Sequence, residues 1–555
     1  MKNLYRYALV LALAGPAALP AAGQGKIKVK VKSKGEQPAA APASAAPPTD
    51  WAMQYAQTID AADLRRHLTV LASDAYEGRE TGEKGQKMAA DYISNRFKEL
   101  GLTGPMTGSD NPYLQHFTLE RTRWNGTPTL LVGKQPFVWK RDFYSTASSP
   151  FLQETTVQPV FAGYGIEQDG YSDYAALGDV KGKDLIILTG EPMKDGKSGL
   201  PAVAAGGKAF VPSTRSKVAL ATQKGARSIF FVNLDTADYR KSRNFVLPYV
   251  EQARMNMLSQ QAPAPRANYF FVSPALGQAL LHTSAEKLAS YRDATAAARQ
   301  PVASSFKPAA FTIKAARKQE TFATENVLGF LEGTDKKEEV LVISSHYDHL
   351  GIKNGVVYNG ADDDGSGTVG VLELAEAFTK AKAEGHGPRR SILFLAVTGE
   401  EEGLFGSEYY TDHPVYPLDQ TIADLNMDMI GRTDKQHEGK PDYVDLVGSD
   451  KLSSELHAIN EAANARYTKL ELDYHYNDPK DPERVYYRSD HYNFAKHKIP
   501  VIFYTTGDHA DYHQPTDDVE KIEFEKLQKR AQLVFYTAWE LANRDQRIVV
   551  DSNKP

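Results

Sequence analysis

Cysteine is absent from this sequence of 555 residues. Its absence excludes disulfides, catalytic thiols and thiolate metal sites, so any metal must be bound by carboxylate oxygen and imidazole. A strong net charge is also missing, since 65 basic and 70 acidic residues give −5 at pH 7. That balance argues against nucleic acid as the main partner. With 41% hydrophobic and 24% charged residues, the composition is that of a globular protein with two or three domains.

The N-terminus has the features of an export signal. Lys2 and Arg6 lie near the start of the chain and precede an apolar run at 8–13. Small residues follow this run. The run is too short to span a membrane permanently. We expect residues 1–23 to be a cleaved signal peptide and residues 24–50, rich in Lys, Ala and Pro, to be a disordered linker. The expected location is the periplasm or the medium, with no integral membrane segment after cleavage.

Patterning along the remaining chain predicts an α/β domain that is interrupted by an insert. Residues 51–150 would form its first part and residues 306–545 its main part. From 322 onward, apolar strands alternate with helical segments, which is typical of a mostly parallel central sheet covered by helices. Between 151 and 305 the strand-like segments lack clustered acids and histidines, and they predict a self-contained β-rich insert.

Side chains able to bind a cation follow the successive strands predicted in the main part. In chain order they are His346, the aspartates at 362–364, the glutamates at 400–402, Asp428 and His513. Because a site in an open α/β sheet gathers beyond the carboxyl ends of the strands, we expect them to meet at one edge.

The aspartates of "GADDDGSG" need a positive partner. No Lys or Arg lies within six residues of them on either side, and adjacent like charges disfavour each other's ionised form. Two metal ions that share a bridging carboxylate would supply that charge and could activate water next to a polarised carbonyl. Imidazole and carboxylate oxygens suit Zn²⁺.

Each motif also has an ordinary structural interpretation. The aspartates could form a turn and a helix N-cap, the glutamates a solvated charged run, and a single histidine a structural contact. The order of the motifs after successive strands favours the metal site. In "HADYH", His509 competes with His513 as the ligand.

Five motifs in order resemble the co-catalytic di-zinc aminopeptidase family, which includes secreted bacterial leucyl aminopeptidases. They are "HYDHLG", "NGADDDGSG", "TGEEEGLFGS", "NMDMIG" and "YHQPTDDVEKI". The stretch 151–305, with "FAGYGI" and "KGARSIFFVN", is similar to the protease-associated domain often inserted in this family. The resemblance implies the zinc exopeptidase fold, a mostly parallel central sheet covered by helices, with that inserted β-rich domain.

The resemblance further implies two zinc ions per chain and a set of ligands. Asp362 would bridge the two ions. His346 and Asp428 would complete the shell of one ion, and Glu401 and His513 the shell of the other.

Two further roles follow from the same resemblance. Glu400 would be the general base, and Asp348 would hydrogen-bond the imidazole of His346 and fix its tautomer. Since a third glutamate follows, a slip of one residue would move the base to Glu401 and the ligand to Glu402.

The implied activity is hydrolysis of N-terminal residues from peptides, with metal-bound hydroxide as the nucleophile. Arg488 and Tyr504 are candidate contacts to the substrate backbone or the tetrahedral oxyanion. A carboxypeptidase of the same family is an alternative, because Arg488 could bind a free carboxylate. Glutaminyl cyclase chemistry is a weaker alternative, and a binding protein with an inactive site a further one.

Overall fold

The computed structural model describes residues 49–552, apart from 205, 208, 252, 259–265 and 441. The predicted signal peptide and nearly all of the predicted linker lie outside the described residues. From Asp50 onward the chain forms one unit. Within the described part of the chain, we find no helix with both the length and the apolar character needed to cross a membrane.

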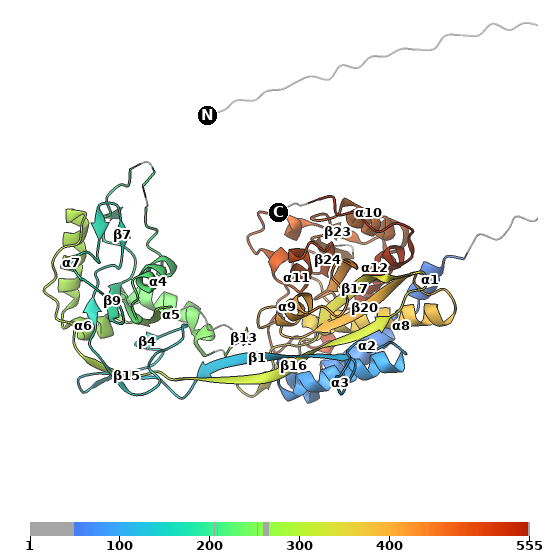
Figure 1. Ribbon diagram of the computed structural model, residues 1–555, viewed down its shortest axis with the longest axis horizontal. Helices are drawn as coiled ribbons and strands as arrows, with labels where there is room; N and C mark the ends of the chain where they lie inside the picture. Colours follow the sequence, from blue (N-terminus) through green and yellow to red (C-terminus); the bar gives the residue numbers. More distant parts are fainter. Residues whose placement is uncertain are drawn as a thin grey trace, which may run out of the picture. The chain divides into compact units, whose positions relative to one another are not determined.

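A nine-stranded sheet organises this unit (Figure 1). Its strands, in spatial order, are β13 (Arg254–Met257), β1 (Leu114–Trp124), β16 (Arg317–Leu331), β20 (Arg390–Val397), β17 (Lys336–His346), β21 (Thr421–Met427), β24 (Val501–Thr505), β22 (Tyr443–Val447) and β23 (Glu471–Asp473). The four middle strands, from β20 to β24, are parallel to one another. The pairs β16–β20 and β24–β22 on either side of them are antiparallel. The predicted α/β fold is confirmed, with the parallel strands at the centre of the sheet.

Both faces of the sheet are covered, which explains why its middle strands are apolar throughout. Every residue of β20 and β21 is buried. Successive side chains of a strand point to opposite faces, so Leu341 and Ile343 of β17 join one core while Val340 and Val342 join another.

Helices on each face complete these cores. The first core includes residues of α1 (Trp51–Ala56), α2 (Ala61–Leu71), α3 (Lys84–Glu99), α8 (Gly367–Ala383), α10 (Ser454–Ala463) and α12 (Phe524–Asn543). The second includes residues of α9 (Phe405–Asp412) and α11 (His491–Lys496).

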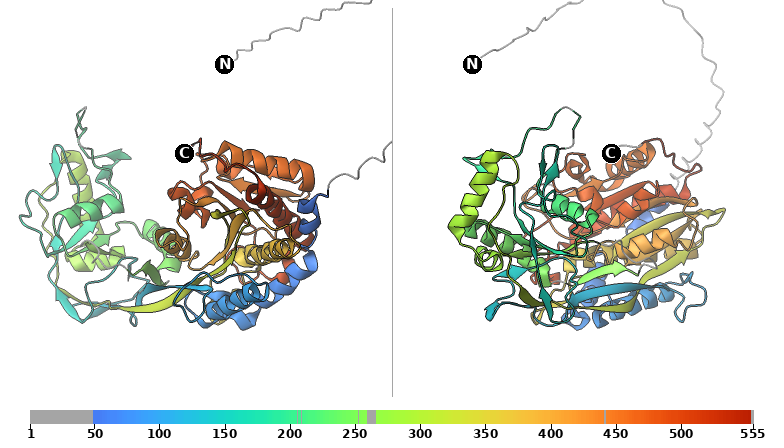
Figure 2. Two further views of the ribbon diagram at one scale, coloured as in Figure 1. Left: turned by 45° about the vertical axis from the view of Figure 1, so that its right-hand side comes forward. Right: turned by 60° about the vertical axis from the view of Figure 1, so that its left-hand side comes forward.

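Between β1 and β16 the chain forms two further sheets, coloured green and blue-green in Figure 2. One has the order β4 (Phe143–Tyr144), β14 (Asn268–Val272), β12 (Ser228–Val232), β9 (Asp184–Leu188) and β6 (Val160–Phe161). The other has the order β3 (Gln135–Phe137), β2 (Thr129–Val132), β15 (Phe311–Lys314) and β5 (Thr155–Val157). This stretch also contains α4 (Thr214–Gln223), α5 (Thr236–Glu251), α6 (Pro274–Leu281) and α7 (Ala285–Ala298).

The elements between β1 and β16 therefore extend beyond the predicted insert of 151–305. β2 pairs with β15, although the two strands lie on opposite sides of that window in the sequence. They share a core with the five-stranded sheet, since Leu130 and Ile313 pack in the same cluster as Phe230 and Phe270. Pairing between strands so far apart in the sequence leaves no local pattern.

Three short hairpins complete the strands. They are β7 (Glu167–Gln168) with β8 (Tyr171–Ser172), β10 (Met193–Lys194) with β11 (Lys197–Ser198), and β18 (Ile352–Lys353) with β19 (Val356–Val357).

Candidate metal centre

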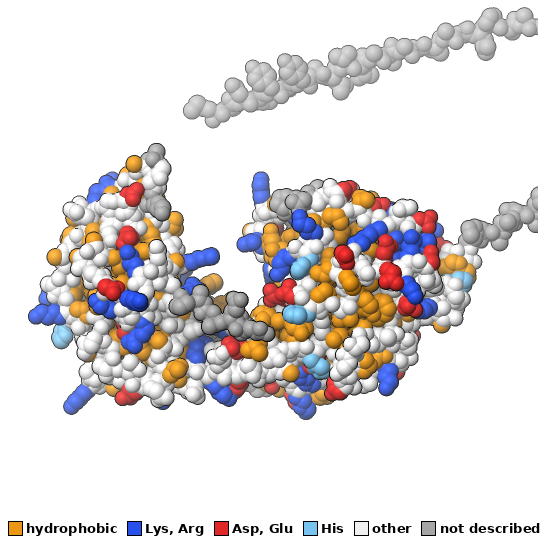
Figure 3. Space-filling model, viewed as in Figure 1, with side chains coloured by type: hydrophobic (Ala, Val, Ile, Leu, Met, Phe, Trp, Pro, Cys, Tyr) orange, Lys and Arg blue, Asp and Glu red, His pale blue; other side chains and the backbone are white. Residues whose placement is uncertain are grey.

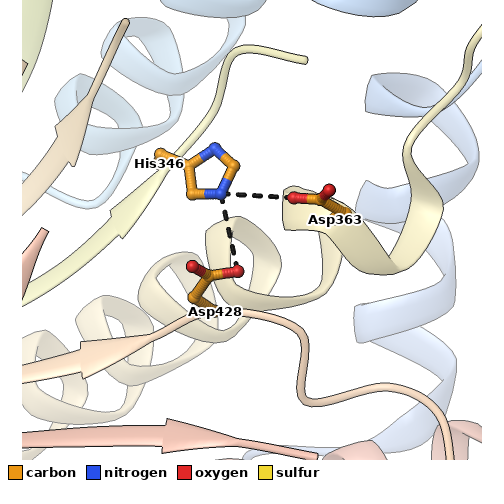
Figure 4. A group of neighbouring side chains, drawn as sticks. All are labelled: His346, Asp363 and Asp428. Atoms are coloured by element: carbon orange, nitrogen blue, oxygen red, sulfur yellow. Dashed lines mark ion pairs between the residues drawn. The ribbon is translucent and has the colours of Figure 1, made fainter. Parts of the chain in front are cut away.

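His346, the last residue of β17, joins the first group of side chains (Figure 4). Its Nε2 lies 3.4 Å from Oδ1 of Asp363 and 3.5 Å from Oδ1 of Asp428. Its Nδ1 lies 3.1 Å from the backbone oxygen of Asp348. Because a carbonyl can only accept, Nδ1 carries the hydrogen and Nε2 is left facing the two carboxylates.

His513 and Glu401 form a second group around the same aspartate. Nε2 of His513 lies 3.1 Å from Oδ2 of Asp363 and 3.1 Å from Oε2 of Glu401. A further histidine, His349, places Nδ1 2.8 Å from Oε1 of Glu401 and 3.7 Å from Oδ2 of Asp363. The two oxygens of Asp363 therefore face different histidine groups.

The structure places Asp363, and not Asp362, in the position expected for the bridging carboxylate. Asp362 accepts hydrogen bonds from the backbone N–H of Gly431 at 2.6 Å and contacts Nε2 of His509 at 3.1 Å. His509 is thus a partner of Asp362, while His513 joins the group around Asp363.

Backbone conformation explains why the three aspartates separate. Asp363 (φ −100°, ψ 101°) and Asp364 (φ −113°, ψ 53°) depart from helical geometry, so successive side chains point in different directions. Asp364 turns toward the start of α8, where Oδ1 accepts from the backbone N–H of Gly367 at 2.8 Å and of Met429 at 3.1 Å. Three identical residues give no sequence signal for such a change in backbone conformation. The sequence therefore could not show which aspartate lies between the two histidine groups.

The adjacent glutamates are also separated. Glu401 lies between His349 and His513, whereas Oε2 of Glu400 lies 3.9 Å from Nε2 of His346. Burial raises the pKa of Glu400 well above its usual range, and the nearby imidazole offsets this only in part. Burial also acts on Glu401, but hydrogen bonds from the two histidines outweigh it and hold the pKa of that carboxyl below its usual value.

This placement tests the alternative in which Glu401 is the base and Glu402 the metal ligand. It is Glu401 that contacts the histidines, and burial raises the pKa of Glu402 to about 8 with Asp348 and Glu80 as neighbouring charges. The geometry favours Glu401 over Glu402 as the ligand.

Asp348 connects several parts of the site through hydrogen bonds. Its Oδ1 lies 3.8 Å from Nδ1 of His346, too far for the hydrogen bond expected from the sequence, which its backbone oxygen makes instead. The carboxylate accepts hydrogen bonds from the backbone N–H of Glu400 at 3.3 Å and from the hydroxyl of Thr81 at 2.7 Å. Asp348 thereby links the loop of the histidine to the loop of the glutamates.

A pocket opens beside these carboxylates. It is lined by Asp363, Glu400, Asp428, Met429, Tyr476, Val485, Arg488, Phe503, Thr505, Gly507, Asp508 and Tyr512. Arg488 is in the pocket wall, as its predicted role requires, with Nη2 3.3 Å from the hydroxyl of Tyr512.

Tyr504, the other predicted substrate contact, lies elsewhere. It is completely buried and donates from its hydroxyl to Oδ1 of Asn460 at 2.8 Å. Since side chains alternate along β24, Phe503 and Thr505 face the pocket while Tyr504 points into the core on the other side of the sheet. The prediction of a substrate contact at Tyr504 is therefore corrected.

Sequence reasoning missed several residues of the site, among them His349, Asp508 and Tyr512. His349 stands three positions after His346 in "HYDH", and Asp508 and Tyr512 stand in the loop that leads to His513. The second histidine of "HYDH" was one available signal. The polar residues that precede His513 in "DHADYH" were another.

The donor set fits metal ions. Among the described residues, several buried atoms of the cluster make no well-aligned hydrogen bond although some of them face one another, namely Nε2 of His346, both ring nitrogens of His349, Oδ2 of Asp363 and Oε1 of Glu401. Unpaired buried polar atoms are costly, so their concentration here indicates a missing partner. Nitrogen and oxygen donors in this proportion suit Zn²⁺.

Sequence comparisons place this site in a known family. Residues 326–538 match peptidase family M28. A probable leucine aminopeptidase of Trichophyton verrucosum (strain HKI 0517) is 30% identical over 215 residues, which are 37% of this chain and 55% of that protein. Aminopeptidase YwaD of Bacillus subtilis (strain 168) is 25% identical over 260 residues, 43% of this chain and 49% of that protein. The chain spans about half the length of these curated relatives.

A structural comparison extends the similarity in fold beyond that segment. The aminopeptidase from Aneurinibacillus sp. strain AM-1 superposes with a TM-score of 0.53 at 20% identity, covering 91% of this chain and 100% of the other. At this identity the match shows a shared fold. Residues 326–538, which contain both histidine groups and the carboxylates between them, form a domain of peptidase family M28, as the five motifs implied.

Proposed function

We propose that this chain is a metallo-aminopeptidase that binds two zinc ions and removes N-terminal residues from peptides. One observation carries the proposal: the carboxylate of Asp363 lies between two groups, with one oxygen toward His346 and the other toward His513. Asp428 completes the first group and Glu401 the second. These five residues would hold the ions, with Asp363 shared and Asp362 outside the shell.

Bound there, two zinc ions would supply a polarised scissile carbonyl and a water whose pKa is lowered toward neutrality. The protein's part is to bring its donors to one place, which the carboxyl ends of the parallel strands do. His346 is fixed in the required tautomer by the backbone oxygen of Asp348.

Glu400 is the group best placed to move the proton. It reaches to 3.9 Å of Nε2 of His346 but, unlike Glu401, it has no ion pair with a second histidine. A cation nearby would favour its ionised form, and the carboxylate could then accept a proton from the water and return it to the leaving amine. Its backbone N–H, bonded to Asp348, holds the base in position.

The pocket favours a free amino group over a free carboxylate. Asp508 lines it outside the proposed set of metal ligands, and its carboxylate would attract an ammonium group. Apolar surface from Met429, Val485 and Phe503 provides room for a hydrophobic side chain. Tyr512 offers a hydroxyl at the same wall that could contact the tetrahedral oxyanion.

Arg488 is the observation that supports a carboxypeptidase as the second candidate, because its guanidinium is in the pocket wall. Matched peptides with a free or an acetylated N-terminus, each with a free or an amidated C-terminus, separate the two activities. An aminopeptidase cleaves both free-amine peptides and neither acetylated one, whereas a carboxypeptidase requires the free C-terminus.

The role of Glu400 is tested with Glu400→Gln. We expect kcat to fall about 10²- to 10⁴-fold because the base is lost, with zinc content near that of the wild type. Glu402→Gln is the matched control and should retain most of the activity. Turnover at the wild-type rate in Glu400→Gln would refute the assignment.

Export and the nature of the insert are inferred from the sequence alone. The N-terminal signal pattern supports a periplasmic or secreted enzyme, and the motifs of 151–305 support a protease-associated domain. Such an insert could restrict the site to short peptides or dock longer ones.

A further inference from the structure

A second cluster of metal-binding side chains lies at the β22–β23 edge of the nine-stranded sheet. It consists of Asp445, Asp473 and His475, and one donor atom from each lies within 4.8 Å of the others. None of these residues belongs to either histidine group around Asp363. Nδ1 of His475 is 3.0 Å from Oδ1 of Asp473 and 3.3 Å from Oδ1 of Asp445.

The local backbone explains this convergence. Asp445 of β22 and Asp473 of β23 are directly paired in a parallel register, so their side chains leave the same face of the sheet. His475 starts the short helix η4 (His475–Asn477) just after β23, and its backbone N–H donates to Oδ1 of Asp473 at 2.8 Å. This turn returns the imidazole over the paired carboxylates.

The burial of Asp445 and the missing hydrogen bonds of its carboxylate point to a ligand. The residue is completely buried, and among the described residues neither carboxylate oxygen has a hydrogen-bond donor. The titratable groups that act on it are His475, Asp473 and His437, and His475 has the largest effect of the three. A buried carboxylate without donors carries a desolvation penalty of several kcal/mol unless a positive charge lies beside it.

His437 fixes the far side of Asp473. Its Nε2 lies 3.2 Å from Oδ2 of Asp473, and its Nδ1 lies 2.7 Å from Oδ1 of Asp434. The ring is buried and stacks on Tyr443, with centroids 3.6 Å apart. Asp473 is therefore held through one oxygen, while its other oxygen faces His475 and Asp445.

The cluster is open on one side. The side chains of Asp473 and His475 are 22% and 35% exposed, whereas that of Asp445 is 1% exposed. An ion could enter from solvent past the two outer ligands and reach the buried carboxylate.

We propose that Asp445, Asp473 and His475 bind a divalent zinc-like ion at a site separate from the proposed catalytic centre. Two carboxylates and one imidazole with an open position for water match a zinc site with three protein ligands. His437 is a positioning residue that orients Asp473 from behind. The ion would also fix η4, and with it Tyr476, which lines the catalytic pocket.

A protonated His475 is the competing source of positive charge. Without an ion, the contact with the carboxylate of Asp445 is the main cause that raises the pKa of His475 to about 9, against an opposing effect of burial. The two explanations differ in whether a metal ion is present, so metal content decides between them.

The test compares the full-length protein with Asp445→Asn and His475→Gln. Each protein is stripped with a chelator, dialysed against Zn²⁺ and passed through a desalting column, and its zinc content is then measured by elemental analysis. We expect each variant to contain one ion fewer per chain than the wild type. His457→Gln, which removes another partly exposed histidine of the same region, is the matched control and should keep the wild-type content.

A second arm separates this site from the catalytic one. In Asp363→Asn, which should lose the catalytic ions, one zinc per chain should remain, and it should be lost on adding His475→Gln. Adding Zn²⁺ should also raise the melting temperature of the folded variants by different amounts. Equal zinc content in the wild type and His475→Gln, or no zinc in Asp363→Asn, would overturn the proposal whatever the fate of the aminopeptidase activity.

Discussion

The loops "GADDDGSG" and "GEEEG" each contain three adjacent acids, whereas acidic and basic side chains are interspersed over the face of the molecule shown in Figure 3. In both, the middle acid contacts His513: Asp363 in the first loop and Glu401 in the second. The flanking acids are directed elsewhere. Asp364 accepts from the backbone N–H of Gly367, the first residue of α8, and Glu400 approaches His346.

The comparison shows that the surroundings, and not the residue type, decide what each carboxylate does. Asp362 is stabilised by a backbone N–H and a histidine outside the cluster, whereas Asp363 lies between the histidine groups of the cluster, with one oxygen toward each. Adjacent identical residues can therefore differ completely in the effect of the same substitution. Each experiment below replaces one acid by its amide, which keeps the shape and removes the charge.

The largest effect is expected for Asp363→Asn. Because this carboxylate lies between both histidine groups, its amide should weaken both metal positions and lower kcat/KM at least about 10³-fold. Zinc content and hydrolysis of a fluorogenic aminoacyl substrate measure the change. A variant that keeps both catalytic ions and near-normal activity would show that the carboxylate between the groups is not shared.

Asp362→Asn should affect stability more than catalysis. The charge that accepts from Gly431 and contacts His509 is lost, so the free energy of unfolding should fall by about 1–3 kcal/mol. Zinc content should stay at the wild-type value and kcat within a few-fold. Denaturant titration with zinc analysis measures both quantities, and a loss of zinc as large as that of Asp363→Asn would restore Asp362 as the bridge.

A buried acid outside both loops offers a further comparison, for which we expect a smaller effect, on the pH dependence of stability. Glu373 of α8 is buried 3.7 Å from the equally buried His67. Burial raises the pKa of Glu373 to about 8 and lowers the pKa of His67 to about 4. A raised carboxyl pKa means that the folded state holds its proton more tightly than the unfolded state, so stability is lost as pH rises toward 8.

The measurement is the free energy of unfolding of wild type and Glu373→Gln at pH 6.5 and 8. At pH 6.5 the unfolded-state histidine is about half protonated and adds a slope of opposite sign, but both proteins share this contribution and their comparison removes it. The wild type should lose on the order of 1 kcal/mol relative to Glu373→Gln over this interval. Parallel pH dependences of the two proteins would contradict the prediction.

Much of the fold could be predicted because it follows local patterns. The alternation of apolar strands and helices expected from 322 onward is found, for example, in β17 (Lys336–His346) and α8 (Gly367–Ala383). The strands after which ligands were expected are parallel neighbours, and this brings His346, Glu401, Asp428 and His513 to one edge. The pairing of β2 with β15 was not predictable, because it joins strands separated by about 180 residues of chain.

By itself, the sequence determined the chemistry available to this protein: without cysteine, its donors are imidazoles and carboxylates, placed after apolar strands by residue order alone. Tertiary structure decided which donors meet. It selected Asp363 among three aspartates, brought in His349, and turned Tyr504 into the core. The physical reason is that periodicity reports which face a residue occupies within its own element, whereas distances between side chains depend on loop conformation and on how separate elements pack.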